Sequence, residues 1–275
     1  MEGTKLAEGK TKVIRAIEGS DEVLIESKDD ITAGDGARKH SFPDKGAIST
    51  ATAVNCFRLL EGKGIRTHFV AQVAPNVFRA RRCVMIPIEI VTRRLAAGSY
   101  LKRHPDVAEG ARFDEPPVEF YLKDDARHDP LMLLDEATST WMLHDAKAPA
   151  GSPPIGTRPL YAQLFGHWSL DRIFIDRLRA IARSAFLAFE EAWAKQGVTL
   201  VDLKIECGVD PETYALLVAD VIDNDAWRIW PGGDKAKMLD KQVYRNLADV
   251  TPEALEAVAA NYAQVAAATE RFLVP

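Results

Sequence analysis

Apolar residues in this chain change repeatedly between strand-like and helix-like spacing, and this mixture limits the possible folds most. Apolar runs at residues 13–17 and 23–26 flank a turn at residues 18–21, which predicts a β-hairpin. Between residues 44 and 64 the apolar positions recur at helical spacing until two glycines end the pattern. Strands and helices do not alternate as in a doubly wound sheet, so we expect an α+β fold.

The rest of the chain adds strands at residues 84–91, a second hairpin and two further helices. Residues 198–206 and 214–222 are β-rich and separated by turn residues, which predicts an antiparallel pair. A helical stripe ends at Gly197, with Ser169 as the expected N-cap, and Thr251 followed by Pro252 marks the start of the last helix. Residues 145–160 hold four of the fifteen prolines, so we expect a loop there.

Composition excludes several classes of protein. With 275 residues, 47% of them hydrophobic and 27% charged, the chain can bury a core as one large domain or two joined ones. Its 35 basic and 40 acidic residues give a net charge of −5, which favours neither nucleic acid nor an anionic membrane as a partner. Three scattered cysteines and the lack of a long apolar segment predict a cytoplasmic protein outside the membrane.

The segment before the first hairpin is a candidate phosphate site. Gly9, Lys10 and Lys12 could form a glycine turn with two cations over a phosphate chain. The five residues between Gly3 and Gly9 exclude a P-loop, which needs four between its glycines. A solvated turn is the alternative interpretation.

A second candidate lies in residues 29–38. Gly34 and Gly36 surround Asp35, so backbone amides there can approach a ligand, and Arg38 can bind a carboxylate or phosphate through two hydrogen bonds. Because Asp-Gly pairs are common in turns, an ordinary surface turn is the alternative.

The strand at residues 201–206 is the most informative segment. A period of two places Asp202, Lys204 and Glu206 on one face, where charges are costly unless they meet ions or one another. If the next strand pairs back, Asp220 approaches this face, and two carboxylates with a lysine suit Mg²⁺ bound together with substrate phosphates. A solvated sheet face is the alternative.

Cations near the Gly98-Ser99 turn and near the C-terminus form the last candidate group. Arginines beside a small turn suit a phosphorylated, carboxylated small molecule, whereas scattered surface charge is the alternative. The group comprises Arg93, Arg94, Lys102, Arg103, Arg228, Lys241 and Arg245.

Taken in order, these segments resemble the SAICAR synthetase family, and the resemblance covers most of the chain. The matching stretches are GKTKVI at 9–14, TAGDGAR at 32–38, Lys45-Gly46, GIRTHF at 64–69, MIPIEIVTRRLAAGS at 85–99, KDDARHDP at 123–130, VDLKIECG at 201–208, Asp220, Asp225 with Arg228, and LDKQVYR at 239–245.

The resemblance implies a ligase that joins L-aspartate to the carboxylate of carboxyaminoimidazole ribonucleotide (CAIR), using ATP and Mg²⁺. It implies an acyl-phosphate intermediate, a β-rich ATP-binding lobe at residues 1–83, a second lobe at residues 84–275 that carries the metal and ribonucleotide sites, and a homo-oligomer.

The resemblance also implies roles for individual residues. Gly9, Lys10 and Lys12 would bind ATP, and Glu206 and Asp220 would hold Mg²⁺. The implied catalytic residues are Lys204, Asp225 and Arg228. The implied substrate-binding residues are Asp35, Gly36, Arg38, Arg93, Ser99, Arg228, Lys241 and Arg245.

Two departures from the family pattern leave other functions open. Ala226 and Trp227 replace small polar residues beside Arg228, and Leu133 and Leu134 replace the usual Asn-Glu pair. A related ligase with an altered substrate and an inactive nucleotide-binding relative are therefore the alternatives.

Overall fold

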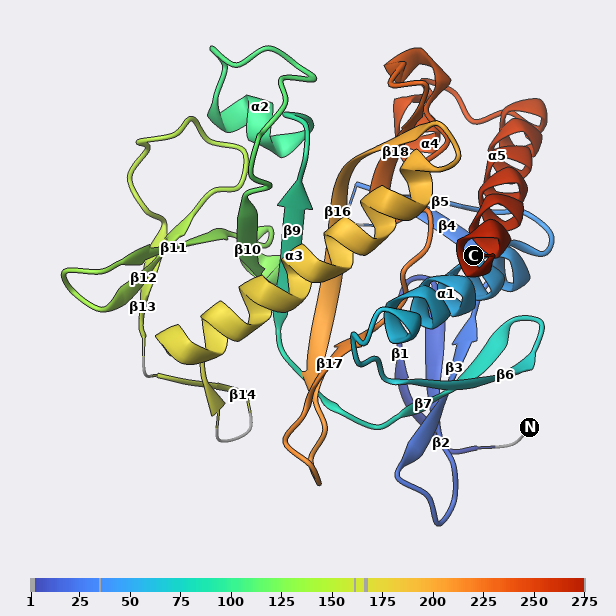
Figure 1. Ribbon diagram of the computed structural model, residues 1–275, viewed down its shortest axis with the longest axis horizontal. Helices are drawn as coiled ribbons and strands as arrows, with labels where there is room; N and C mark the ends of the chain where they lie inside the picture. The colour runs from blue at the N-terminus through green and yellow to red at the C-terminus, as the bar shows by residue number, and fades with distance from the viewer. Residues whose placement is uncertain (1–2, 35, 161, 166–167, 275) are drawn as a thin grey trace. The chain divides into compact units, whose positions relative to one another are not determined.

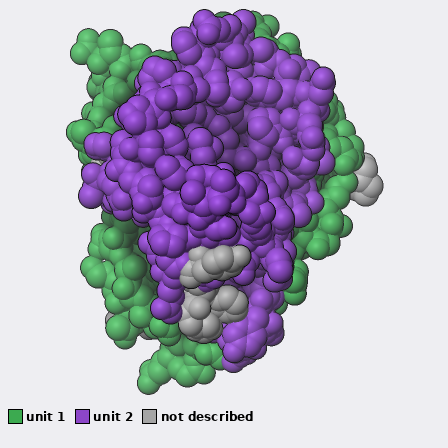
Figure 2. All heavy atoms as spheres, turned by 90° about the vertical axis from the view of Figure 1, so that its left-hand side faces the viewer, with its two compact units in different colours: residues 1–83, 188–199, 221–275 green, residues 84–187, 200–220 purple. Residues whose placement is uncertain are grey.

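The computed structural model describes the chain except for residues 1–2, 35, 161, 166–167 and 275 (Figure 1). It contains two compact units. Unit 1 comprises residues 1–83, 188–199 and 221–275, and unit 2 comprises residues 84–187 and 200–220 (Figure 2). The first crossing between units follows Cys83, but the chain then crosses three more times. The assignment of ATP binding to residues 1–83 stays a prediction.

Unit 1 is built on an antiparallel sheet with the strand order β1-β2-β3-β7-β6. The predicted first hairpin is confirmed as β2 and β3, with Ile14 opposite Ile25. A two-stranded sheet, β4-β5, lies in the same unit. The strands are β1 (Lys5–Glu8), β2 (Lys12–Ala16), β3 (Glu22–Ser27), β4 (Asp30–Ala33), β5 (Arg38–Ser41), β6 (Phe69–Ala74), β7 (Val77–Arg81) and β18 (Trp227–Pro231).

Two long helices from opposite ends of the chain pack together in unit 1 (Figure 1). They are the predicted helices α1 (Lys45–Gly62) and α5 (Pro252–Glu270), and the buried Asn55 amide donates a hydrogen bond of 3.1 Å to Thr269 Oγ1. Thr251 is the N-cap of α5, as predicted, since its Oγ1 accepts from the Ala254 N–H at 3.2 Å. Short helices complete the unit: α4 (Gln242–Asn246), η2 (Lys235–Lys237) and η3 (Arg271–Leu273).

Unit 2 contains most of a larger antiparallel sheet with the order β13-β12-β11-β10-β9-β16-β17. The second predicted hairpin is confirmed as β16 and β17, with Glu206 opposite Ala219. The strands are β8 (Val84–Met85), β9 (Ile88–Arg93), β10 (Val118–Leu122), β11 (Leu131–Asp135), β12 (Thr140–His144), β13 (Gly156–Pro159), β14 (Gln163–Phe165), β15 (Trp168–Ser169), β16 (Val198–Val209) and β17 (Leu216–Ala219).

Among the local predictions for unit 2, one is confirmed in outline and two need correction. Residues 84–91 contain strands, as expected, but as two short ones, β8 and β9, which Pro87 separates because it has no N–H to donate. The expected loop at residues 145–160 ends in strand β13, which pairs with β12. Ser169 lies in β15, and Asp171 Oδ1 instead accepts from the Phe174 N–H at 2.8 Å, beside the start of α3 (Arg172–Ala194).

Helix α3 begins in unit 2 and ends in unit 1. Within unit 2 it packs on the sheet through cation–π contacts, in which Arg179 lies 5.6 Å from the ring centroid of Phe120 and Arg94 lies 5.9 Å from that of Phe186. The remaining short helices of unit 2 are α2 (Ser99–Arg103) and η1 (Asp125–Arg127). Across the described parts of the chain, no helix is both long and apolar enough to span a membrane.

Candidate active site

Strand β16 carries the charged face that the sequence predicts. Lys204 Nζ lies 2.9 Å from Glu89 Oε1 and 3.2 Å from Glu206 Oε1, so the lysine joins two carboxylates. Glu206 is only 4% exposed and also accepts from Lys123 Nζ at 2.7 Å. Burial opposes protonation of Lys204, but these carboxylates raise its pKa above the ordinary value. The solvated-face interpretation is therefore wrong.

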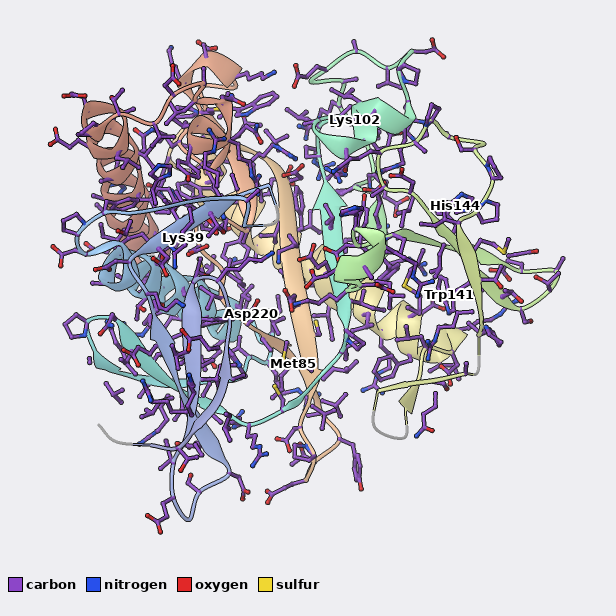
Figure 3. All side chains as sticks on the ribbon, turned by 180° about the vertical axis from the view of Figure 1, so that it is seen from behind. Lys39, Met85, Lys102, Trp141, His144 and Asp220 are labelled. Atoms are coloured by element: carbon purple, nitrogen blue, oxygen red, sulfur yellow. The ribbon has the colours of Figure 1, made fainter. Side chains whose placement is uncertain are left out.

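The β16–β17 pairing brings the backbone of Asp220 near Glu206. Asp220 directly follows Ala219, the residue opposite Glu206, and its backbone φ is 62° (Figure 3). Aspartate adopts this left-handed region more readily than most residues do. Glu206 and Asp220 offer the hard oxygen donors that fit Mg²⁺, which commonly uses one or two carboxylates together with substrate phosphates. Among the described residues, no group of three or more His, Cys, Asp or Glu side chains could hold a metal ion.

Arg93 and Ser99 meet in a second buried cluster of unit 2. The Arg93 guanidinium is 3% exposed and lies 2.7 Å from both Asp202 Oδ2 and Glu119 Oε2. Its Nη2 also donates to Ser99 Oγ at 3.3 Å. Burial opposes ionisation of Glu119, but Arg93 and Arg103 lower its pKa below the ordinary value. The structure therefore brings Arg93 and Ser99 together, with the arginine already held by two carboxylates.

In unit 1, the two glycine-containing candidate segments lie side by side. The Gly9 N–H donates to Lys12 O at 2.9 Å and closes the β1–β2 turn. A Cβ atom added to Gly36 would lie 3.4 Å from Lys10 Cε, so the loop at Gly36 packs against this lysine. Asp35 lies outside the described residues. Lys10 and Gly36 are thus close enough to act on one ligand.

Arg38 serves the fold directly. Its Nη1 donates to Leu247 O at 2.6 Å and its Nη2 donates to Arg245 O at 2.9 Å. The guanidinium also lies 5.0 Å from the centroid of the Tyr244 ring. These contacts attach β5 to the end of α4, while the Arg245 side chain stays exposed.

The third cluster surrounds Asp225 in unit 1 and is called the Asp225 cluster below. Asp225 Oδ2 accepts from Lys241 Nζ at 2.5 Å, and its Oδ1 accepts from the Tyr262 hydroxyl at 2.9 Å. Lys45 Nζ lies 3.9 Å from Asp223 Oδ2. Burial opposes ionisation of Asp225, but Lys241 and Lys45 lower its pKa to about 2. The cluster comprises Lys45, Asp223, Asp225, Lys241 and Tyr262.

Trp227, the most conspicuous departure from the family pattern, is a core residue. It is 3% exposed and packs edge-on against Trp193, with ring centroids 5.4 Å apart. Since side chains alternate along a strand, Trp227 and Arg228 at the start of β18 point to opposite faces. Ala226 is also buried, so both replacements lie in the packing around Arg228.

Sequence reasoning gave no role to several residues of these clusters. Lys45 and Lys123 belong to stretches that match the family, which was the available signal. Tyr262 gave no signal in the sequence, because its hydroxyl partner is 37 residues away. The other missed members are Glu89, Glu119 and Tyr121, whereas Arg103 was among the candidate cations.

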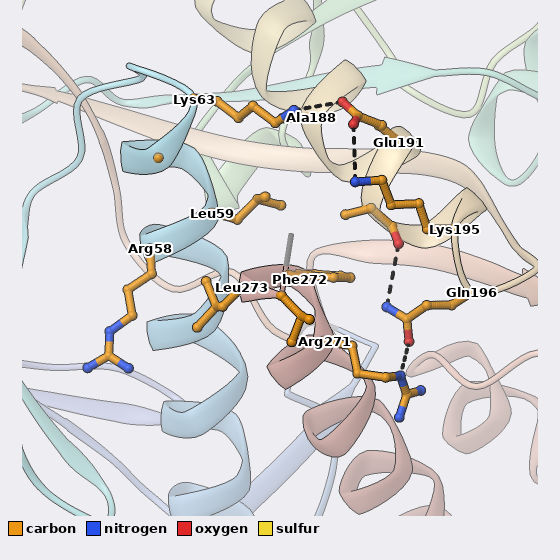
Figure 4. A pocket seen from close by; sticks show the side chains of 13 residues that line it. Arg58, Leu59, Lys63, Ala188, Glu191, Lys195, Gln196, Arg271, Phe272 and Leu273 are labelled. Atoms are coloured by element: carbon orange, nitrogen blue, oxygen red, sulfur yellow. Dashed lines mark hydrogen bonds and ion pairs between the residues drawn. The ribbon is translucent and has the colours of Figure 1, made fainter.

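A pocket of about 410 Å³ in unit 1 contains none of the expected site residues (Figure 4). Its apolar lining includes Leu59 and Phe272, and Glu191 at its edge pairs with Lys63 at 2.8 Å and with Lys195 at 3.5 Å. The candidate site is therefore defined by the charged clusters.

The carboxylates gathered on the strands of this α+β fold suit Mg²⁺, and its cations suit phosphorylated ligands. The model of the SAICAR synthetase family matches residues 5–262. The chain belongs to this family, which confirms the resemblance seen in the sequence.

Individual relatives match over nearly the full length. The phosphoribosylaminoimidazole-succinocarboxamide synthase of Roseiflexus castenholzii is 50% identical over 272 residues, which are 98% of each chain. A solved type-2 SAICAR synthetase in complex with ADP is 31% identical, with a TM-score of 0.74 over 94% of this chain and 97% of that one. The synthase of Ehrlichia chaffeensis is 28% identical, with a TM-score of 0.78 over 98% and 99%. These structures bear out the α+β prediction.

Proposed function

We propose that the protein is the ATP-dependent ligase of purine biosynthesis that joins L-aspartate to CAIR, giving SAICAR, ADP and phosphate. The full-length match to a named synthase at 50% identity carries this proposal. A free carboxylate is a poor electrophile, so ATP first phosphorylates the CAIR carboxylate. The aspartate amine then attacks the acyl phosphate, and phosphate leaves.

In this proposal, Gly9, Lys10 and Lys12 bind the ATP phosphates, and the ADP complex of a relative supports nucleotide binding. Glu206 and Asp220 hold Mg²⁺, which when bound neutralises phosphate charge. Lys204 stays protonated between Glu89 and Glu206 and offsets charge on the transferred phosphoryl group.

The ribonucleotide is the second ligand. Its phosphate and carboxylate suit arginines, and its ribose hydroxyls suit an ionised carboxylate such as Asp225. Contacts within the protein hold the guanidinium groups of Arg93 and Arg38 in place, so both groups are oriented before a ligand binds. The proposed residues are Arg93, Ser99, Asp225, Arg228 and Arg245, with Asp35, Gly36, Arg38 and Lys241 nearby.

The altered-substrate alternative has lost its main support, because the Trp227 side chain lies in the core. Leu133 is exposed on the β11 strand and gives no reason for a different acid or amine. We place the enzyme in the cytoplasm as a homo-oligomer of at least two copies, which light scattering on the purified protein tests.

The reaction is tested by ADP release from purified protein with Mg-ATP, CAIR and L-aspartate, omitting one component at a time. We expect ADP to form only when all are present, with SAICAR as the product. A sample that binds ATP but releases no ADP would contradict the proposal and favour an inactive relative.

A further inference from the structure

The Asp225 cluster contains two buried residues that the proposed reaction does not use, Lys45 and Tyr262. We propose that both are positioning residues for the ribonucleotide site: Tyr262 fixes the Asp225 carboxylate directly, and Lys45 fixes it through Asp223. Asp225 is then oriented to accept a hydrogen bond from a ligand hydroxyl. This inference rests on the proposed function.

The geometry around Asp225 leaves one direction open. Tyr262 donates to Oδ1 at 2.9 Å and Lys241 donates to Oδ2 at 2.5 Å, so rotation of the carboxylate breaks at least one of these bonds. An ionised carboxylate has about four acceptor sites, so each oxygen keeps capacity for a further donor. The side chain of Asp225 is 27% exposed, whereas that of Lys241 is 9% exposed and Tyr262 is 1% exposed. The protein's donors therefore approach from the buried side, and the remaining acceptor positions are accessible to a ligand.

Lys45 acts on Asp225 indirectly, through Asp223. Its ammonium lies 3.9 Å from Asp223 Oδ2, and Asp223 Oδ1 accepts from the Asp225 backbone N–H at 2.9 Å. Lys45 thus steadies the turn that carries Asp225. Its charge also favours the ionised form of Asp225, which is the form that can only accept hydrogen bonds.

The position of Lys45 is unfavourable for stability alone. It is the first residue of α1 and only 2% exposed, so a cation is buried at the positive end of a helix. Among the described residues, the first turn of α1 has no acidic side chain, and Asp44 makes no capping hydrogen bond. Local rules of this kind are broken most often at functional sites. The cost of burying this lysine is therefore explained if it orients a ligand-binding carboxylate.

The test is Tyr262→Phe, which removes one hydroxyl and keeps the ring in its packing. We expect the KM for CAIR to rise about tenfold, as for loss of a hydrogen bond to a charged group, while kcat and the KM for ATP stay within about twofold. Tyr244→Phe is the matched control. Tyr244 is buried in the same apolar cluster, but its hydroxyl contacts His40 Nδ1 at 2.8 Å, so its loss should leave the KM for CAIR unchanged.

A purely structural role for Tyr262 predicts that both variants lose stability and neither changes the KM for CAIR. That outcome overturns the proposal. Lys45→Met should also raise the KM for CAIR in the fraction of the protein that folds. If Lys45→Met does not fold, the Tyr262→Phe result alone decides the proposal. Absence of turnover in the wild-type enzyme would instead refute the proposed function, so the two failures are distinguishable.

Discussion

His68 shows how the surroundings of a single residue determine its charge. It is 3% exposed and packs edge-on against Phe57 and Phe78, and its Nε2 has no hydrogen-bond partner among the described residues. Burial, with a smaller effect of Lys12, lowers the pKa of His68 to about 3. The ring is therefore neutral in the folded protein well below neutral pH.

This neutral histidine predicts acid sensitivity. In the unfolded chain its pKa is about 6.5, so between pH 6.5 and about 3 the unfolded state binds more protons and stability falls as pH falls. From pH 8 to pH 5, His68 should remove about 2 kcal/mol from the free energy of unfolding. Urea denaturation at both pH values, on wild type and His68→Leu, measures this loss. An equal loss in the two proteins would show that His68 is not responsible.

Asp220 has the clearest prediction in the candidate metal site. Asparagine tolerates the positive φ of 62° at this position, so Asp220→Asn should keep the fold while removing a charged Mg²⁺ ligand. We expect turnover to fall roughly a hundredfold or more with an unchanged circular dichroism spectrum. Asp135→Asn, at the end of β11 in the same unit, is the control, because Asp135 belongs to none of the charged clusters. Wild-type turnover in Asp220→Asn would refute the metal assignment.

At the scale of elements, the start of α1 is limited by how closely it approaches β3. A Cβ atom on Gly46 would lie 2.5 Å from Ser27 O, and the Gly46 N–H donates to Asp29 Oδ1 at 2.8 Å. Gly62, at the other end of the helix, has nothing within 4 Å of such an atom. Two glycines of one helix therefore differ in their tolerance of a methyl group.

Alanine substitution should lower stability at Gly46 but not at Gly62. Gly46→Ala should lower the free energy of unfolding by about 1–3 kcal/mol through the clash with backbone. Gly62→Ala should leave it unchanged or raise it by up to about 1 kcal/mol, because alanine favours helix. Urea midpoints of the two variants provide the comparison, and equal effects would mean that packing at Gly46 can adjust.

Residues adjacent in sequence predicted the helices and strands better than they predicted which distant segments pair or contact one another. The β2–β3 and β16–β17 hairpins and the start of α5 followed from residues adjacent in sequence. Strand β13 was missed because it lies in a proline-rich segment and depends on its pairing with β12, which the local sequence does not reveal. In the site, a period of two grouped Lys204 with Glu206. Glu89 lies 115 residues from Lys204 and Lys123 lies 83 residues from Glu206, so the alternation along one strand could not link them to this group.

At the scale of the whole molecule, unit 1 needs both ends of the chain. Helix α1 packs against α5, and buried residues of α5, including Val258 and Tyr262, complete an apolar cluster with Ile31 and Phe42. Residues 1–83 therefore contain the five-stranded sheet and α1, but they lack α5, which packs against α1.

A fragment of residues 1–83 should consequently fail to fold by itself. Removing residues 188–199 and 221–275 exposes the α1 face that α5 covers, and a small unit without that burial is marginal. We expect no cooperative urea transition by circular dichroism, whereas the full chain shows one. A cooperative transition in the fragment would mean that residues 1–83 form an independent domain.

The Asp225 cluster also restricts how this protein can change over generations. Removing one member of a buried, compensated set leaves an opposite charge without its partner, which costs about 3–5 kcal/mol, comparable to much of a domain's total stability. Replacing several members together by apolar residues is far less costly. Lys45, Asp223, Asp225 and Lys241 come from both ends of the gene, so a lineage reaches such a combined replacement only through intermediates that fold poorly. Drift at these four positions should therefore be slow and correlated.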